Sequence, residues 1–519
     1  MKKQLIYSLI LSLGIAGSGC SDLLDTTTYG QQTSETFYKT DTQIGEALTG
    51  AYLQLRVTWN EYALDHCLIG DCTTDDALKG GGSEGDMGEM YDMEQFITQP
   101  SNAEVARRWR LLYGLINRAN DVIYYAPSAQ GDSELLERYT NEAKVLRAFG
   151  YYFLVTSFGD VPLITEPTTP DAVITKTRTP KEKVYELIIQ DLTDAKDLPA
   201  KGEYPESDQY RVTSGMAKAM LAKTYMFTYN YVEAEKVLKD IVDSKKYKLL
   251  PQYGFNWFKE YQNSSESVFE IPNQMYSKNV ATGTNVPHFF TSRAAVAGYG
   301  GYGFHCPSQD LWNAYTADDP RLTYVFTHTG DRYVGDNQDQ DNSVSPTGYH
   351  DYKMTVPAVD KAGWDVWLIT YNIRFIRYAD ILLLYAEALN ENNKSGDALI
   401  YLNEVRKRAR ETDPVDPRRE KQVYIPATTS NSLPDITTTN KDELRRIIWE
   451  ERRRELAMEG WRREDLIRQK RFGQVMKAFA TKYNTTKGAR FDENRDYLLP
   501  IPQSERDRTN NAISQNPNY

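Results

Sequence analysis

The chain has 519 residues, of which 26% are charged, and its formal net charge at pH 7 is −11. A protein this acidic repels nucleic acid and anionic lipid headgroups, which argues against binding to either. Its four cysteines are too few and too irregularly spaced for a disulfide framework or a zinc site. The sequence leaves open whether Cys67 and Cys72 pair with each other.

Residues 1–19 have the features of an export signal. Lys2 and Lys3 precede an apolar stretch, and small residues then lead to Cys20. The apolar stretch is shorter than the roughly 20 residues that span a bilayer. This arrangement predicts a lipoprotein in which Cys20 is acylated after cleavage, and the alternative is an ordinary signal peptide cut nearby. Attachment to a membrane would then depend on the lipids of Cys20, because no later segment is apolar enough to span one.

Apolar residues recur with helical spacing along much of the remaining chain, which predicts a mostly α-helical protein. The stretches with this spacing are 104–125, 134–158, 181–198, 213–228, 232–242, 378–390, 396–410 and 442–458. We expect them to form a single discontinuous domain over residues 20–519, with its helical body at about 20–250 and 371–519.

Two of the predicted helix pairs repeat one another. The matched residues are small or apolar and have the same spacing in both pairs: Ala222, Ala234, Leu238 and Ile241 in the first, and Ala386, Ala398, Leu402 and Val405 in the second. Small residues at matched points let two helices approach closely. The pattern resembles tetratricopeptide-like helix hairpins, which stack to bury a shared core.

The character of the chain changes between residues 251 and 370, where Gly, Asn, Asp and aromatic residues follow no sustained period. A shorter region of the same kind covers residues 71–99. Long loops in a compact protein are usually functional or disordered. Because these segments are rich in aromatic residues, we expect long irregular loops there that bind ligand.

Residues 298–303 have the glycine spacing of a dinucleotide-binding turn. That motif requires a strand before it and a helix after it, whereas here no strand precedes it and Phe304 to Pro307 follow. We therefore reject a dinucleotide site and predict no cofactor. A loop of glycine and tyrosine is better suited to presenting flat rings to a ligand.

Sugar rings expose C–H groups that stack on aromatic rings, and their hydroxyls hydrogen-bond to polar side chains. Each aromatic residue taken alone is more often part of a core, but the group as a whole favours binding. The candidate ligand-binding residues are Asp75, Asp76, Tyr91, Phe96, Asn102, Tyr299, Tyr302, Phe304, Trp364 and Trp367.

A glycosidase would need a pair of carboxylates, and Asp380 with Glu387 is the pair to consider. Seven helical residues separate them by roughly 10.5 Å along the axis, compared with about 5–5.5 Å in retaining and about 6.5–9.5 Å in inverting enzymes. Side-chain reach could shorten this distance, but a structural role is favoured. The chain also lacks a His-Glu-x-x-His helix, a Gly-x-Ser-x-Gly elbow and a phosphate loop, so we predict no catalytic residues.

The stretch 442–458 places Glu451 and Glu455 on the same helical face as several apolar residues. We therefore expect both glutamates to be partly buried and paired with arginine. The candidate partners are Arg374, Arg377 and Arg462.

Five segments together resemble the SusD/RagB family of surface lipoproteins: residues 20–25, 147–163, 376–406, 451–460 and 498–519. The strings Arg-Ala-Phe-Gly-Tyr-Tyr-Phe-Leu-Val from Arg147 and Ile-Arg-Tyr-Ala-Asp-Ile-Leu-Leu from Ile376 are especially specific. Asn518 stands where the family usually has glycine, and asparagine also tolerates positive φ.

The resemblance implies a binding protein on the outer leaflet of the outer membrane that takes part in polysaccharide utilisation. It also implies a partner, a TonB-dependent transporter of the SusC type, over which the protein would sit as a lid and to which it would pass captured oligosaccharide. The family's ligand loops vary, so the resemblance transfers no binding residue. Peptide cargo in the same role, or a surface glycoside hydrolase, are the alternatives.

Overall fold

The structure is a computed structural model that describes residues 37–169, 172, 174–273, 284–293, 301–336, 338–357 and 369–519, without the side chains of 57–61. Four residues singled out from the sequence lie outside this range: Cys20, Tyr299, Trp364 and Trp367. Within the described part of the chain, no helix combines the length and apolar character that crossing a membrane requires.

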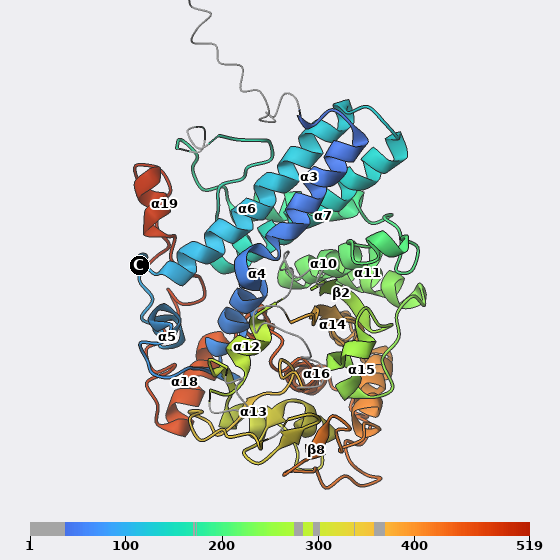
Figure 1. The fold of residues 1–519 in the computed structure, drawn as a ribbon, viewed down its shortest axis with the longest axis vertical. Coiled ribbons are helices and arrows are strands. Elements are labelled where there is room, and N and C mark those ends of the chain that lie inside the picture. The colour runs from blue at the N-terminus through green and yellow to red at the C-terminus, as the bar shows by residue number, and fades with distance from the viewer. Residues whose placement is uncertain are drawn as a thin grey trace, which may run out of the picture.

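The first half of the chain forms a layer of long helices. It consists of α3 (Asp41–Gln54), α4 (Val57–Cys67), α6 (Ala103–Tyr125), α7 (Ser133–Phe158) and α9 (Lys181–Asp194), and α3, α6 and α7 lie together at the top of Figure 1. The side chains of Thr40, Asn102 and Asp132 accept hydrogen bonds from the first-turn N–H groups of α3, α6 and α7. These polar residues therefore set where the long helices begin.

Two helix hairpins follow, α10 (Ser214–Phe227) with α11 (Tyr231–Asp243) and α14 (Tyr378–Glu391) with α15 (Ser395–Arg410). The eight matched residues of the predicted repeat are all at most 2% exposed. Each connecting turn contains a residue with positive φ, Tyr229 at 61° and Asn393 at 62°. The amide of Asn392 donates to the carbonyl of Tyr231 at 2.9 Å, which ties the two hairpins together.

The C-terminal part adds α16 (Lys441–Glu455), α17 (Arg462–Arg468), α18 (Phe472–Tyr483) and α19 (Gln503–Arg508). The main hydrophobic core runs through the helix layer and both hairpins. A smaller core joins α18 to residues distant in sequence, with Phe96, Phe472 and Phe491 in mutual edge contact.

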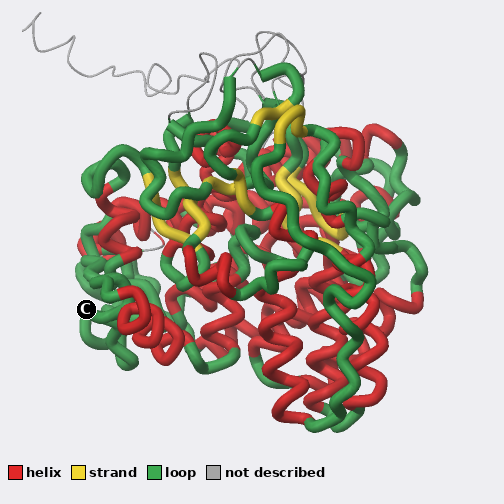
Figure 2. The backbone as a smooth tube through the Cα atoms, turned by 90° about the horizontal axis from the view of Figure 1, so that it is seen from below, coloured by secondary structure: helices red, strands yellow, loops and turns green. Residues whose placement is uncertain are grey.

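Short antiparallel strands pair segments that are far apart in the sequence. The pairs are β1 (Ala77–Gly80) with β3 (Phe304–Pro307), β2 (Ser267–Ile271) with β7 (Ile373–Arg377), β4 (Phe326–Thr327) with β6 (His350–Asp351), and β5 (Arg332–Tyr333) with β8 (Arg419–Lys421). Figure 2 shows these strands among loops in one part of the molecule, while helices fill the remainder.

Shorter helical turns complete the described elements. These are α5 (Gly88–Glu94), α12 (Val286–Phe290), α13 (Gln309–Asn313), the π-helix η2 (Leu68–Cys72) and the 3₁₀ turns η3 (Ala126–Ser128), η4 (Glu206–Asp208), η5 (Tyr253–Trp257), η6 (Lys259–Tyr261) and η7 (Pro320–Tyr324).

The mostly helical class predicted from the sequence is confirmed, and each predicted helix is present. Some boundaries differ, since α9 ends at Asp194 and α16 at Glu455. The two regions predicted to be loops are more ordered than expected. Residues 71–99 contain β1 and α5, and residues 251–370 contain short strands and helical turns between irregular segments.

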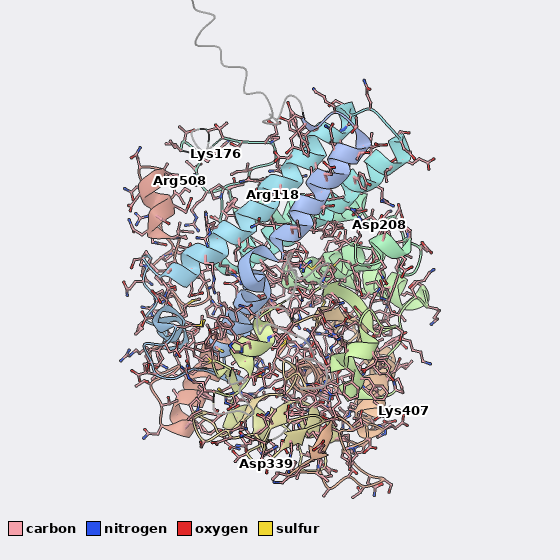
Figure 3. All side chains as sticks on the ribbon, viewed as in Figure 1. Arg118, Lys176, Asp208, Asp339, Lys407 and Arg508 are labelled. Carbon is pink, nitrogen blue, oxygen red and sulfur yellow. The ribbon has the colours of Figure 1, made fainter. Side chains whose placement is uncertain are left out.

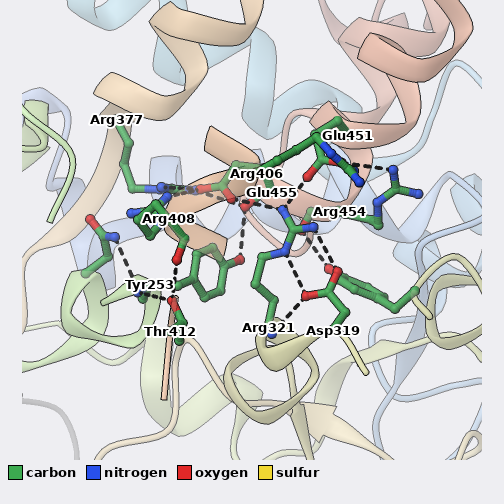
Figure 4. Close-up of polar contacts among 12 residues, drawn as sticks. Tyr253, Asp319, Arg321, Arg377, Arg406, Arg408, Thr412, Glu451, Arg454 and Glu455 are labelled. Atoms are coloured by element: carbon green, nitrogen blue, oxygen red, sulfur yellow. Dashed lines mark hydrogen bonds and ion pairs between the residues drawn. The ribbon is translucent and has the colours of Figure 1, made fainter. Parts of the chain in front are cut away.

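A buried ion-pair network joins α16 to the surrounding elements, as Figure 4 shows. Glu451 and Glu455 are 0% exposed, so they are more completely buried than the sequence suggested. Arg377 contacts Glu455 at 3.1 Å and is the one predicted partner that pairs with either glutamate. The remaining contacts come from Arg321 with both, Arg406 and Arg454 with Glu451, and Arg408 with Glu455.

The other two predicted partners pair elsewhere. Arg374 lies 3.7 Å from Glu270, and Arg462 binds Asp75 at 2.9 Å. Burial alone would raise the pKa of Glu451, but Arg321 and its neighbouring guanidinium groups hold it well below its usual range. The guanidinium groups around Glu451 therefore favour its charged form inside the protein.

Candidate functional site

A surface hollow of about 320 Å³ lies where β1, α5, the segment 344–346 and the segment 485–487 meet. Its wall is the turn from Lys79 to Glu84, with Tyr91 and Glu94 of α5 beside it. In Figure 1 this part of the molecule lies around α5, at the left.

The turn depends on glycine because it runs against β3. Gly80 and Gly81 have φ angles of 73° and 80°, which disfavour other residues. A Cβ atom at Gly80 would lie 2.3 Å from the carbonyl oxygen of Gly303. The far end of the turn is held by Asp86, which accepts from the Gly82 N–H at 2.8 Å and pairs with Arg293 at 2.6 Å.

Lys79 fixes the turn from inside. Its ammonium donates to the carbonyl oxygens of Ser83 at 2.9 Å and Asp86 at 2.5 Å. The same nitrogen lies 6.0 Å from the ring centre of Tyr91 and 5.6 Å from that of Phe304. The Tyr91 hydroxyl donates to Glu84 at 2.8 Å. This half-exposed ring is therefore positioned by Glu84 at its hydroxyl and by Lys79 at its face.

Behind the turn lies a cluster of aromatic rings. Tyr302 makes edge contacts with His288 at 4.8 Å and Phe289 at 5.0 Å, and Phe304 stacks on Phe289 at 6.0 Å. Tyr302 is half-buried and can present part of its ring. Phe304 is only 2% exposed and lies on β3, so it supports the site from the core and does not lie in a loop as expected.

Four half-buried rings form a second surface, the aromatic platform of Trp312, His328, Tyr349 and Tyr424. Trp312 stacks on Tyr349 with 5.2 Å between ring centres and 4° between planes, and His328 stacks on Tyr424 at 5.4 Å. Trp312 also meets Tyr424 edge-on at 5.0 Å. None of the four was predicted from the sequence, although the aromatic content of residues 251–370 was the available signal for three of them.

One loop links the hollow to the aromatic platform. Val344 and Pro346 line the hollow, and Tyr349 belongs to the platform. β3, the partner of β1, contacts β6, which directly follows Tyr349 in the chain. The Ser345 hydroxyl donates to the carbonyl of Tyr349 at 2.7 Å, which fixes the loop between the two surfaces. The hollow and the aromatic platform therefore both offer flat rings and polar groups, and one loop joins them.

Asp75 and Asp76 do not line this surface. Arg462 binds Asp75 with two contacts of 2.9 Å, and Arg453 binds Asp76 at 2.7 Å, with both carboxylates at most 2% exposed. Burial raises the pKa of Asp76 to about 6, against the opposing effect of Arg453 and Arg462. Asp75 and Asp76 were expected to contact ligand. Their partners lie within the protein instead, so the structure gives both carboxylates a structural role.

Asn102 and Phe96 are also occupied inside the fold. Asn102 caps α6 by accepting from the N–H groups of Glu104 and Val105 at 3.0 and 3.1 Å, and it is 5% exposed. Phe96 is 4% exposed in the smaller core. Of the described candidates, Tyr91 and Tyr302 are therefore the two that remain at the surface beside the hollow.

The carboxylate pair considered for hydrolysis has structural partners. Asp380 binds Lys223 at 2.6 Å and Arg452 at 2.8 Å. Glu387 binds Arg468 at 2.6 Å and accepts from the indole N–H of Trp449 at 2.9 Å. Both carboxylates are at most 1% exposed, which confirms the structural interpretation.

Cys67, Cys72 and Cys306 are buried free thiols. Cys67 and Cys72, whose pairing the sequence left open, are therefore unpaired. Burial raises the pKa of each thiol, which disfavours the reactive thiolate. No three described His, Cys, Asp or Glu residues are grouped to hold a metal ion.

Comparison with known proteins gives a consistent result along the chain. A family profile described as "SusD family" matches residues 265–519, and one described as "Starch-binding associating with outer membrane" matches residues 22–226. The SusD-like protein P2 of Formosa agariphila is 28% identical over an alignment of 548 positions that covers all of both chains.

Solved structures share the fold. A "Laminarin binding SusD-like protein" is 26% identical, with a TM-score of 0.76 over 93% of this chain and 100% of its own. The surface glycan-binding protein A from Bacteroides fluxus is 25% identical, with a TM-score of 0.75 over the same shares.

Proposed function

This chain belongs to the SusD-like family, and from that membership we propose that it binds oligosaccharide at the cell surface through the hollow and the aromatic platform. The relatives named for laminarin and for surface glycan support this class of ligand. The observation that carries the proposal is that one loop joins the two surfaces: its Val344 and Pro346 line the hollow, and its Tyr349 stacks on Trp312 in the platform. Such rings match the C–H faces of successive sugars.

The charges of the hollow favour a neutral glycan. Lys79 is bonded to two backbone carbonyls, and Lys487 donates to the carbonyls of Cys72 at 2.9 Å and Ala77 at 2.5 Å. These cations are therefore satisfied by the protein itself, while Glu84 and Glu94 add negative charge to the lining. A strongly anionic chain would meet repulsion without free cations to bind it.

The role is binding without catalysis. Members of this family bind carbohydrate and do not cleave it. Because Asp380 and Glu387 are both held in buried ion pairs, neither could exchange protons with a sugar at the surface without breaking those pairs.

We also propose that the protein is held at the outer membrane by lipids on Cys20 and delivers its ligand to a SusC-like transporter. The family description "associating with outer membrane" supports the location. Metabolic labelling of cells with an alkyne fatty acid tests the anchor, because labelling should be lost in Cys20→Ser. Capture of the transporter with the tagged protein from detergent extracts tests the partnership, and a transporter-free eluate would contradict it.

Site-directed variants test the ligand surface. We expect Tyr91→Ala and Trp312→Ala each to weaken oligosaccharide binding by roughly 1–3 kcal/mol, because each removes an aromatic anchor. The matched control is Tyr124→Ala, which truncates a ring that is 55% exposed on α6, outside both surfaces. Isothermal titration calorimetry measures all three, and unchanged affinity in the double variant would contradict the assignment.

A further inference from the structure

A second pocket, of about 370 Å³, opens between α6, the segment after α7 and α19. Trp109 and Tyr113 come from α6, Pro162 and Ile164 from the next segment, and Arg508 from α19. The pocket shares no lining residue with the hollow or the aromatic platform. It lies within the size range of small-molecule sites.

The floor of this pocket is rigid and largely apolar. Trp109 is 3% exposed and packs against Tyr113 at 4.9 Å and Phe158 at 5.1 Å between ring centres. The Tyr113 hydroxyl donates to the carbonyl of Pro162 at 2.8 Å, which fixes the ring while leaving it half-buried. Ile164 and Ile513, both buried, complete the floor.

The rim of the pocket carries more positive than negative charge. Lys176 is exposed and forms no ion pair with any described residue. The ionic partner of Arg508 is Glu505, one turn earlier on the same short helix. The opening of the pocket is thus lined by three cations, Arg110, Lys176 and Arg508, and by one carboxylate, Glu505. The protein as a whole has a net charge of −11. Figure 3 shows Lys176 and Arg508 near each other at the upper left.

The floor also contains an unused donor. No acceptor in the described part of the chain hydrogen-bonds to the indole N–H of Trp109, although the side chain is almost completely buried. The indole nitrogen itself is open to solvent, so it can donate to a molecule that enters the pocket. This pocket therefore differs from the hollow, where the protein satisfies Lys79 and Lys487 with its own carbonyls.

We propose that this pocket binds one sugar ring that carries an anionic group, either a carboxylate or a phosphate. The ring lies on the face of Tyr113, as sugar C–H groups stack on aromatic rings. Lys176 and Arg508 bind the anion through charge-assisted hydrogen bonds. The indole N–H of Trp109 donates to a sugar oxygen.

Titration of the purified protein with four probes tests the inference: glucuronate, glucose 6-phosphate, glucose and inorganic phosphate. Saturable binding of glucuronate or of glucose 6-phosphate, at least about tenfold tighter than both glucose and phosphate, supports the proposal. The preferred sugar acid then identifies the anion. Equal affinity for glucose would overturn the anionic part, and equal affinity for phosphate would overturn the sugar part.

A pair of charge reversals locates the binding. Lys176→Glu should weaken binding of the preferred probe by about tenfold or more, since it replaces a cation that pairs with no described carboxylate by a repelling charge. Lys196→Glu makes the same change in net charge at an exposed lysine outside the pocket. An equal loss in both variants, or no loss in Lys176→Glu, would overturn the site. Both positions are exposed, and circular dichroism of each variant verifies the fold.

Discussion

Arg377 is the most heavily engaged cation of the buried network. It is 0% exposed at its side chain and contacts Glu266 and Glu459 at 2.7 Å and Glu455 at 3.1 Å. A buried ion pair gives little net stability over apolar packing, but removing one partner leaves the other charge uncompensated. Each of the three carboxylates keeps a second cation, Arg408 or Lys353, but loses part of its charge compensation when the guanidinium of Arg377 is removed.

We expect Arg377→Met to lower the free energy of unfolding by about 3–5 kcal/mol, because it removes one cation from a buried network and leaves excess negative charge there. Urea denaturation followed by circular dichroism measures the change. The control is Lys183→Met, which breaks an ion pair with Glu186 in which both side chains are 63% exposed. That control should cost less than about 1 kcal/mol. Similar losses in the two variants would contradict the importance assigned to burial.

His305 joins two carboxylates in the core and should make stability depend on pH. Its ring nitrogens lie 3.0 Å from Asp351 and 3.0 Å from Asp71. Burial would lower the pKa of His305, but these two hydrogen bonds outweigh it and raise the pKa from 6.5 to about 9. The stabilisation is then complete below pH 6.5 and is lost as pH rises through about 9.

We therefore expect the free energy of unfolding to fall between pH 6.5 and 9, by at most about 1.4 kcal/mol per pH unit from this group. His305→Gln should remove that part of the decline, because glutamine does not titrate. Urea denaturation of both proteins at several pH values gives the two slopes. Identical slopes would show that His305 is not the titrating group.

The sequence predicted some of the buried ion-pair partners and missed others. Glu451 and Glu455 were expected to pair with arginine because they share an apolar face, and Arg377 was among the partners named. Asp75 and Asp76 were expected to face ligand because their surroundings are loop-like in composition. Their partners Arg453 and Arg462 are distant in sequence, and the periodicity of a single chain does not report such contacts.

At the scale of elements, α6 offers a test that separates structure from binding. Asn102 was predicted to contact ligand but caps this helix. Asn102→Ala should lower the free energy of unfolding by about 1 kcal/mol and leave oligosaccharide affinity unchanged. Asn102→Asp keeps an acceptor at the cap and should cost less. Weaker binding in Asn102→Ala without any loss of stability would restore the ligand role.

Long amphipathic helices were predictable, whereas short elements were not. The spacing of apolar residues identified α6 and α7 because each extends over many turns. α17 has seven residues, all but one of them buried, so it shows no alternation between a polar and an apolar face. The strands have two to five residues and pair across long sequence separations, so neither length nor local turns indicated them.

At the scale of the whole molecule, the proposed ligand surface is assembled from segments that helices and strand pairs bring together. β1 holds the glycine turn against β3, and β6 places Tyr349 near Trp312 of α13. The sequence identified the aromatic-rich regions and two of the surface rings, Tyr91 and Tyr302. It could not identify the platform, since stacking of Trp312 on Tyr349 depends on tertiary contacts.

We propose that this protein captures a neutral oligosaccharide and releases it intact. Calorimetric titration of the purified protein against neutral oligosaccharides, acidic oligosaccharides and peptides, followed by chromatography of the recovered ligand, tests it most directly. We expect saturable binding of a neutral oligosaccharide that is recovered at its original length. Shortened products, or binding of peptides and of no glycan, would contradict it.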